Sequence, residues 1–224
     1  MTTSPTAEVP QRPGAAQWVP PGAGLDQLRA AAAACGGCEL HGPATQTVFS
    51  SGSPTARLAF VGEQPGDAED RQGAPFVGPA GRLLDQALQQ AGIDRSDTYV
   101  TNAVKHFRFT ATPQRRLHQT PDLVHITACR PWLVAELAVV DPEVVVCLGA
   151  TAARALLGPA FRVTRQRGIL YPRTARSRDP ALVQAGWMMG TVHPSAVLRA
   201  DDRDAAFAAL VADLEVAAAA MVPA

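Results

Sequence analysis

Short apolar runs alternate with longer helical patterns from Arg57 to the end of the chain. Four of these runs are typical of buried strands, and they cover residues 57–62, 98–104, 143–148 and 187–192. Helical spacing covers residues 82–91, 122–140, 150–157 and 202 to about 220, and Pro131 is expected to kink or divide the second of these helices. Because strands alternate with helices, we expect an α/β fold of three layers, α/β/α, around a central, mainly parallel four-stranded sheet.

The start of the chain has a different composition. Residues 1–22 contain five prolines and few aliphatic side chains, which predicts a flexible N-terminal tail. An Ala-rich helix is expected at residues 25–34, directly before Cys35. A chain of 224 residues fits one domain of generous size, so we expect residues 23–224 to form a single domain.

Composition and charge narrow the class of protein. Apolar residues make up 47% of the chain and charged residues 18%, which favours a packed core over disorder. Lys and Arg balance Asp and Glu at 20 each, which argues against a protein that binds polyanions through bulk charge. We see no apolar run near the roughly 18 residues of a membrane helix and no export signal, so we expect a cytoplasmic protein without membrane contact.

Polar residues follow three of the four expected strands. The strand ends carry the segment from Gly62 to Gly66, then Asn102, and then the segment from His193 to Ser195. Ligands on parallel sheets bind beyond the carboxyl ends of the strands, so these three groups are expected to converge on one edge. Residues 98–121 hold no acid but several basic side chains, which form either a solvated loop or a surface that follows phosphates.

Four motifs carry a specific resemblance. The stretch GEQPGDAEDRQGAPFVGPAGRLLD at 62–85 resembles the first motif of the iron–sulfur uracil-DNA glycosylases of family 4, and TNAVK and HPSAVLR resemble the second and third. The CxxC at Cys35 and Cys38 resembles the family's amino-terminal cluster ligands. Alone, Gly-x-x-Pro-Gly is only a tight turn, but the four motifs keep the family's order over about residues 25–215. The resemblance implies a uracil-DNA glycosylase fold and the excision of uracil from DNA.

A basic segment resembles one subgroup more closely. The stretch KHFRFTATPQRRLH at 105–118 is similar to UdgX, the subgroup that becomes covalently attached to uracil-containing DNA. UdgX proteins usually read Lys-Arg-Arg-Ile-His, where this chain has Gln114 for Lys and Leu117 for Ile. A histidine in isolation is more often a surface residue. The resemblance implies instead that His118 is a nucleophile that becomes linked to C1′ of the abasic sugar.

The cysteines bear on a cofactor. Four cysteines without an export signal favour a metal or a cluster over disulfides, and from spacing alone zinc would suit the CxxC as well as iron. The resemblance implies a [4Fe–4S] cluster held by Cys35, Cys38, His106 and Cys129, with His106 at a position where family 4 has cysteine. Cys147 lies in a buried apolar strand and is expected to be a small core side chain.

The resemblance also implies a uracil pocket. Phe76 would stack on the flipped base, and Asn102 would pair with uracil O4 and N3–H, a polarity that cytosine reverses. Gly62 and the main-chain groups around Gln64 and Asp67, with the side chains of these two residues as a second possibility, would border the remaining edge of the ring. The alternatives are a core aromatic for Phe76 and a turn-capping side chain for Asn102.

The remaining implied roles concern bond cleavage and DNA. Glu63 would lie near C1′ and stabilise the cationic sugar, and His193 would donate a hydrogen bond to uracil O2. The residues expected to contact DNA are Gly78, Gly81, Arg115, Arg116, Ser195 and Arg199.

We therefore expect a monomeric UdgX-like glycosylase that excises uracil from DNA, with single strands favoured, and remains linked to its product. A family 4 enzyme that turns over by hydrolysis is the first alternative. A non-catalytic binder of uracil or single-stranded DNA is the second, although recognition alone requires neither Glu63 nor His193. A zinc or redox protein is the third, and it leaves the GEQPG and HPS motifs unexplained.

Overall fold

A computed structural model describes residues 12–176 and 186–221. Its main sheet has six strands in the order β1-β3-β2-β6-β8-β7. These are β1 (Ser50–Gly52), β2 (Leu58–Gly62), β3 (Thr98–Asn102), β6 (Val144–Leu148), β7 (Leu170–Pro172) and β8 (Trp187–Thr191). The four expected strands are present and all pair in parallel, but the expected count of four is wrong. The edge strands β1 and β7 pair antiparallel, and with three residues each they are too short to show a periodicity.

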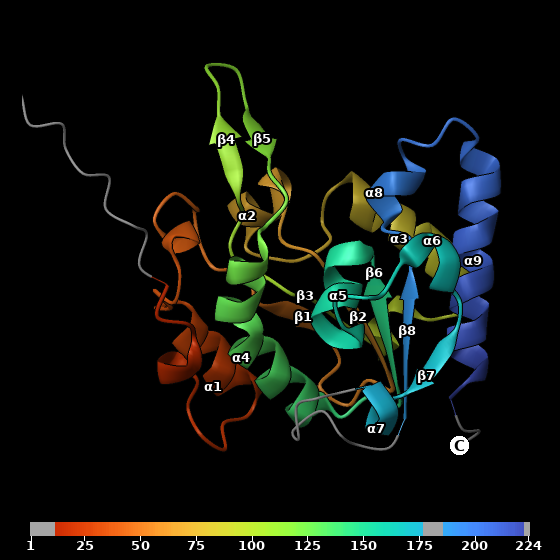
Figure 1. Ribbon diagram of the computed structural model, residues 1–224, viewed down its shortest axis with the longest axis horizontal. Coiled ribbons are helices and arrows are strands. Elements are labelled where there is room, and N and C mark those ends of the chain that lie inside the picture. Colours follow the sequence, from red (N-terminus) through yellow and green to blue (C-terminus); the bar gives the residue numbers. More distant parts are fainter. Residues whose placement is uncertain (1–11, 177–185, 222–224) are drawn as a thin grey trace, which may run out of the picture.

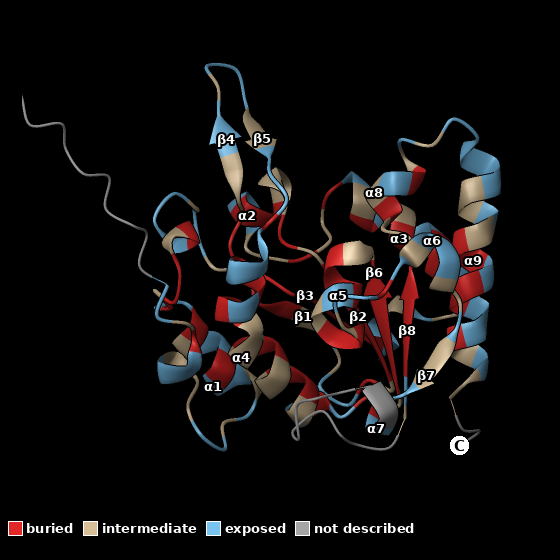
Figure 2. Ribbon diagram, viewed as in Figure 1, coloured by how far each residue is buried: buried red, intermediate tan, exposed pale blue. Residues whose placement is uncertain are grey.

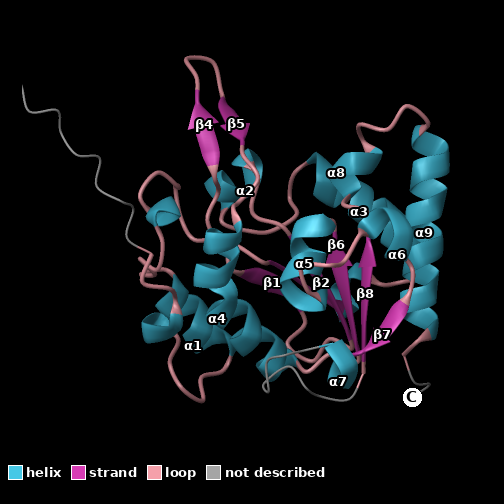
Figure 3. Ribbon diagram, viewed as in Figure 1, coloured by secondary structure: helices cyan, strands magenta, loops and turns pink. Residues whose placement is uncertain are grey.

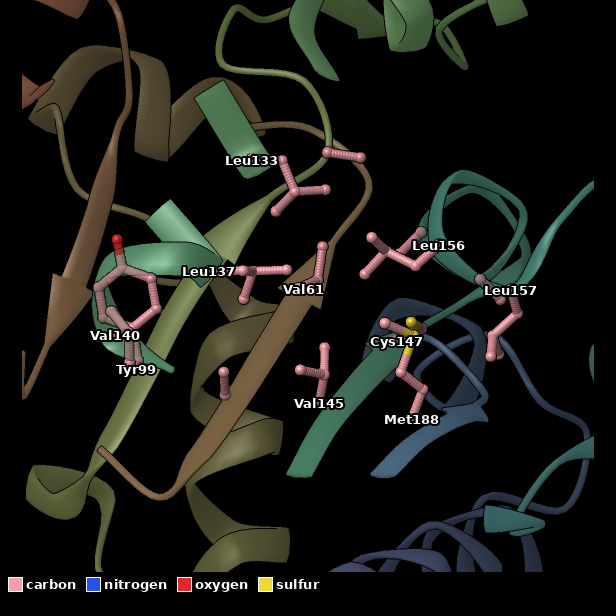
Figure 4. Packing of buried hydrophobic residues seen from close by; sticks show 14 of the residues in the cluster. Val61, Tyr99, Leu133, Leu137, Val140, Val145, Cys147, Leu156, Leu157 and Met188 are labelled. Atoms are coloured by element: carbon pink, nitrogen blue, oxygen red, sulfur yellow. The ribbon is translucent and has the colours of Figure 1, made fainter. Parts of the chain in front are cut away.

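Helices cover both faces of this sheet, as predicted (Figure 1). Successive side chains of a strand point to opposite faces, so Val61 and Phe60 belong to two different core clusters. On the face that carries Val61, α4 (Leu123–Val140) and α5 (Ala150–Leu157) pack through leucines such as Leu133 and Leu156 (Figure 4). On the other face lie α3 (Pro79–Gln90), α8 (Pro194–Val197) and α9 (Arg203–Ala219). The central strands are almost wholly buried between these layers (Figure 2).

A two-stranded hairpin stands apart from the main sheet (Figure 3). Its strands β4 (Phe109–Ala111) and β5 (Arg116–His118) pair antiparallel, with Phe109 opposite His118. The sequence predicted only a basic loop here, because neither strand alternates long enough to be seen. The remaining elements are short or terminal, namely α1 (Leu25–Ala32), α2 (Asp67–Gln72), α6 (Val163–Gln166), α7 (Arg173–Arg176) and the 3-10 turns Ala16–Trp18, Glu39–His41 and Arg95–Asp97.

Helix α4 runs unbroken from Leu123 to Val140, so Pro131 does not divide it. Within the part of the chain that the structure describes, it is the one helix long and apolar enough to cross a membrane, and half of it is buried. The helix is not an uninterrupted apolar run, because His125, Arg130 and Glu136 lie within it. Packing explains the composition, because α4 contacts the sheet through Leu133 and a separate N-terminal cluster through Trp132.

The chain packs before residue 23. The Ala15 amide donates to the Ala128 carbonyl at 2.7 Å, and the Gly14 amide donates to the Gly37 carbonyl at 3.0 Å. Arg12 forms an ion pair with Glu39. Residues 12–22 are thus held by backbone hydrogen bonds, which differs from the expected tail, while residues 1–11 lie outside the described residues.

A buried ion pair lies under the end of β3. Lys105 and Glu136 are about 1% and 0% exposed and contact each other directly. Glu136 also accepts hydrogen bonds from the hydroxyls of Tyr99, at 2.9 Å, and Thr101, at 3.0 Å. The Lys105 ammonium donates to the Asn102 carbonyl at 3.0 Å, so the network fixes the backbone where β3 ends. A buried charge is tolerated only when it is paired in this way.

We expect Glu136→Leu and Lys105→Met each to lower the free energy of unfolding by about 3–5 kcal/mol, because each leaves an uncompensated buried charge. The double variant should recover most of that loss, since it buries no charge. Urea denaturation of the three variants measures this. A double variant as unstable as the sum of the single ones would contradict the account.

Candidate active site

A cavity of about 990 Å³ opens beyond the carboxyl ends of the parallel strands. In Figure 1 this edge of the sheet lies toward the hairpin, α5 and α8. Many of the predicted site residues line it, and they are Glu63, Gln64, Asp67, Phe76, Asn102, His118, His193, Ser195 and Arg199. Thr151 and Arg154 of α5 also line it, although the sequence analysis did not single them out.

Two glycines let the cavity wall close up. Gly62 pairs with Asn102 across the parallel strands, and a Cβ atom on Gly62 would clash with the Asn102 amide and lie 2.6 Å from the Phe76 ring. A Cβ atom on Gly81 would clash with the Phe76 carbonyl. Phe76 has a φ of 57°, and its ring stacks on His193 with centroids 6.0 Å apart and planes at 28°. Because Gly62 and Gly81 have no side chains, Asn102 and Phe76 can pack closely in the wall of the cavity.

Glu63 follows Gly62 and has a different partner on each carboxylate oxygen. Its Oε1 lies 3.3 Å from Nε2 of His118, and its Oε2 accepts a hydrogen bond from the Thr151 hydroxyl. The Glu63 carbonyl accepts from the Val104 amide at 3.0 Å, which ties its backbone to the segment after β3. The structure thus brings Glu63 and His118 together. Thr151 could have been found by the reasoning about strand ends that was used for Glu63, because it lies three residues after the end of β6, the one expected strand to which the sequence analysis assigned no polar group.

His193 is held in one orientation by Ser195. The Ser195 amide donates to Nδ1 of His193 at 3.1 Å, and the Ser195 hydroxyl lies 2.8 Å from the same atom. Nδ1 is therefore an acceptor and the proton of the neutral ring lies on Nε2. Burial, with the charges of Arg199 and His118, lowers the pKa of His193 to about 4. At neutral pH the ring is an uncharged donor, and Ser195, expected to contact DNA, serves as its anchor.

Gln64 joins the two ends of the hairpin. Its Nε2 donates to the carbonyls of Arg108, at 3.2 Å, and Gln119, at 3.0 Å, while its Oε1 accepts from the Arg108 amide at 3.0 Å. Both N–H donors of this side-chain amide and one of the two lone pairs on its oxygen are thus engaged by backbone groups. The Gln64 side chain therefore binds the two ends of the hairpin, which leaves its main-chain groups as the ones available to the edge of a uracil ring.

Arg116 joins the hairpin to α2. Its guanidinium contacts the carboxylates of Asp67 and Asp70, the latter at 2.6 Å, and lies 5.3 Å and 4.9 Å from the ring centroids of Phe107 and Phe109. Asp70 is fully buried, so the pairing is required to offset the cost of its charge. Arg116 was expected to contact DNA, but its guanidinium binds Asp67 and Asp70 inside the protein, while the neighbouring Arg115 is exposed. Asp67 also lines the cavity, where it was expected.

The start of α3 offers no open amide at Gly78. The Gly78 amide donates to Oε1 of Glu69 at 2.8 Å, and Glu69 is itself buried. The expected contact of Gly78 with a DNA phosphate would have to replace this hydrogen bond. Gly81 lies inside the same helix and packs against the Phe76 backbone. This close packing explains why position 81 has a glycine.

The cysteines fall into two groups. Cys35, Cys38 and Cys129 belong to the N-terminal cluster around Trp132, whereas Cys147 is buried in β6, where burial raises its pKa to about 12. All four are free thiols in the described ranges 12–176 and 186–221. Within those ranges no three His, Cys, Asp or Glu side chains form a preassembled metal-binding group.

Donors nevertheless point at two of the clustered sulfurs. The Trp132 indole donates to Sγ of Cys35 at 3.2 Å, and the Lys105 amide donates to Sγ of Cys129 at 3.3 Å. His106 is buried, and its Nε2 lies 2.9 Å from the Thr47 hydroxyl. Since Thr47 donates its own proton to the Ala32 carbonyl, Nε2 carries the ring proton and Nδ1 keeps a lone pair.

Comparison with known proteins agrees with this geometry. Residues 49–215 match the model of the uracil-DNA glycosylase superfamily, so the chain belongs to that superfamily. It is similar to the type-4 uracil-DNA glycosylase of Thermotoga maritima, with 37% identity over 74% of this chain and 78% of that protein. The type-4 enzymes of Pyrobaculum aerophilum and Archaeoglobus fulgidus are 35% and 33% identical over 74% and 78% of this chain, and over 80% and 83% of their own lengths.

The contrast between two adjacent arginines gives a test of the hairpin. Arg116→Ala should lower the free energy of unfolding by about 3 kcal/mol, because Asp70 loses its charged partner inside the protein. Arg115→Ala should change it by no more than about 0.5 kcal/mol, as expected of an exposed side chain. Urea denaturation measures both, and amide hydrogen exchange should speed up in residues 108–119 of the first variant only. Equal effects of the two substitutions would show that Arg116 does not anchor the hairpin.

Proposed function

We propose that this protein removes uracil from DNA by cleaving the N-glycosidic bond, with water as the attacking group. The observation that carries the proposal is the meeting of Glu63, Asn102 and His193 in one cavity at the edge of the sheet. The names of its type-4 relatives favour hydrolysis with turnover. Single-stranded DNA is the favoured substrate in this proposal, because a base outside a duplex enters a pocket without the cost of unpairing.

Recognition of the base would rest on Asn102 and Phe76. Asn102 is 2% exposed and its carbonyl accepts a hydrogen bond from Lys105, so the backbone that carries its side-chain amide is held in place. A fixed amide that pairs with O4 and N3–H of uracil would leave polar groups unsatisfied with cytosine. The ring of Phe76 supplies a stacking surface in the same cavity.

Cleavage leaves negative charge on uracil O2 and positive charge on the sugar. A neutral His193 with its proton on Nε2 can donate to that oxygen without first losing a proton, an effect worth about 3 kcal/mol for one aligned donor. The Glu63 carboxylate can stabilise the cationic C1′ and orient the attacking water. Both groups act on charge that develops only during the reaction, as catalysis requires.

Uracil release from a single-stranded oligonucleotide tests the proposal. The protein should convert a uracil-containing strand, and not a thymine-containing one, into an alkali-cleavable abasic product. Asn102→Asp should slow single-turnover release by about 100-fold, since an ionised carboxylate cannot donate to O4. An Asn102→Asp protein as fast as the wild type would remove this residue from base recognition, and a wild type without release would contradict the function.

The position of His118 favours a second outcome of the same cleavage. We propose that its imidazole can replace water at C1′, since Nε2 lies 3.3 Å from Glu63 Oε1. The bond from C1′ to uracil N1 would break with its electron pair leaving on the base. Glu63 would first accept the proton on Nε2 of the imidazolium, which leaves a neutral ring with its remaining proton on Nδ1. The Nε2 lone pair would then form the new bond to C1′. An imidazole held beside the sugar has a high effective concentration relative to water.

The adduct is testable by denaturing gel electrophoresis after incubation with a uracil oligonucleotide. The wild type should give a shifted band beside the free abasic strand, and mass spectrometry should map the modified peptide to His118. His118→Ser should give the abasic strand and no shifted band, because water is then the one attacking group left at C1′. A shifted band at full yield in that variant would exclude His118, and a wild type that yields only abasic strand would leave hydrolysis as the whole reaction.

We also propose a [4Fe–4S] cluster held by Cys35, Cys38, Cys129 and His106. Three buried cysteines in one cluster, N–H donors at two of the sulfurs and a free lone pair on Nδ1 of His106 suit this ligand set. When bound, such a cluster links segments far apart in the chain by metal–ligand bonds. The N-terminal residues, the segment after β3 and α4 would then be held together beside the site.

Metal analysis tests this assignment. Protein purified without oxygen should be brown and contain about four irons per chain. Cys129→Ser should lose iron, whereas Cys147→Ser is the matched control and should keep it, because Cys147 lies in the core of the sheet. Stoichiometric zinc without iron, or equal loss from both variants, would contradict the ligand set.

A further inference from the structure

The Thr151 hydroxyl lines the cavity and donates a hydrogen bond directly to Oε2 of Glu63. Thr151 itself is only 9% exposed, while the Glu63 side chain is 20% exposed. The hydroxyl therefore approaches the carboxylate from the buried side and leaves Oε1 toward His118 and the open cavity.

The backbone that carries Thr151 is fixed to the sheet. Helix α5 begins after Gly149, whose amide donates to the Thr191 carbonyl of β8 at 2.9 Å and whose φ is 90°. The next turn buries Ala152 and Ala153 completely against the core of the sheet. Because Gly149 is the N-cap of α5, the Thr151 hydroxyl is not the capping group of that helix. Its hydrogen bond to Glu63 is a contact between α5 and the end of β2.

Glu63 needs such a contact to have a defined direction. Its other oxygen faces His118, whose side chain is 49% exposed and lies on the hairpin. An exposed partner on a projecting element restrains a carboxylate less than a buried partner on a packed helix does. Of the two contacts, the one from Thr151 is thus the better fixed.

We propose that Thr151 is a positioning residue for Glu63. By occupying Oε2 it fixes the rotation of the carboxylate, so that Oε1 is directed at C1′ and at the group that attacks it. The inference rests on the proposed function, because it assigns to Glu63 the stabilisation of the sugar. It holds for water and for His118 as the attacking group, since both would be held by the same oxygen.

The proposal separates the rate of cleavage from the binding of DNA. Thr151→Val keeps the shape of the side chain but removes the donor, and it should lower the single-turnover rate constant of uracil release by about 10- to 100-fold. The dissociation constant for a uracil oligonucleotide should stay within about 2-fold, because Thr151 reads neither base nor phosphate. Thr151→Ser restores the hydroxyl and should release uracil within about 3-fold of the wild type.

Two further variants make the test specific. Thr98→Val removes a buried hydroxyl at the opposite end of β3 and should leave the rate unchanged. In a Glu63→Ala protein, Thr151→Val should cause no additional loss, since its effect passes through Glu63. Thermal unfolding identifies any variant that fails to fold, and Thr151→Ala replaces Thr151→Val in that case.

The outcomes of these experiments distinguish a failure of the inference about Thr151 from a failure of the proposed function. A wild type that releases uracil together with a Thr151→Val protein of full rate overturns the inference and leaves the function intact. An additive loss in the Glu63→Ala background, or no recovery in Thr151→Ser, overturns it as well. A wild type that releases no uracil contradicts the proposed function itself.

Discussion

The parallel pairing of β2 with β3 on one side and β6 on the other determines where the groups of the site begin. In this register Gly62 lies beside Asn102, and the residues that follow β2 and β6 meet over the same edge. Glu63 follows Gly62, and Thr151 follows the Gly149 turn after β6. A shift of one strand by one residue would turn its core side chains outward, so burial of both faces maintains the register on which the site depends.

Two of the ion pairs hold parts of the site from inside the protein. Lys105 and Glu136 pair beneath Asn102, and Arg116 pairs with buried Asp70 at the base of the hairpin. Such pairs contribute little net stability compared with apolar packing, but the loss of one partner is costly. Their effect here is to give fixed positions to an amide on β3 and to the hairpin that carries His118.

The elements that the sequence predicted well are those with enough residues to show a period. The four parallel strands and the helices at α3, α4, α5 and α9 were found, because each buries a long apolar run or face. The two edge strands of the main sheet and the two strands of the hairpin have three residues each. A strand of three residues is too short for an alternation of apolar and polar positions to be recognised. The N-terminal residues 12–22 pack through backbone hydrogen bonds, to which side-chain composition gives no guide.

Only the site residues that belong to recognisable motifs could be predicted from the sequence. Glu63, Asn102 and His193 follow strand ends, and the rule for parallel sheets brings them together. Arg115 and Arg116 are adjacent and chemically identical, so only the tertiary contacts with Asp67 and Asp70 separate an exposed arginine from an anchored one. The pairing of Lys105 with Glu136 spans 31 residues and two elements, which no local pattern records.

The most direct measurement is a crystal structure of the Glu63→Gln protein with a single-stranded oligonucleotide that contains one uracil. The account predicts the base in the cavity at the strand ends, with its ring against Phe76, its O4 and N3 at the Asn102 amide and its O2 at Nε2 of His193. C1′ of its sugar should then face residue 63. A uracil bound outside this cavity, or one whose sugar faces away from residue 63, would contradict the account.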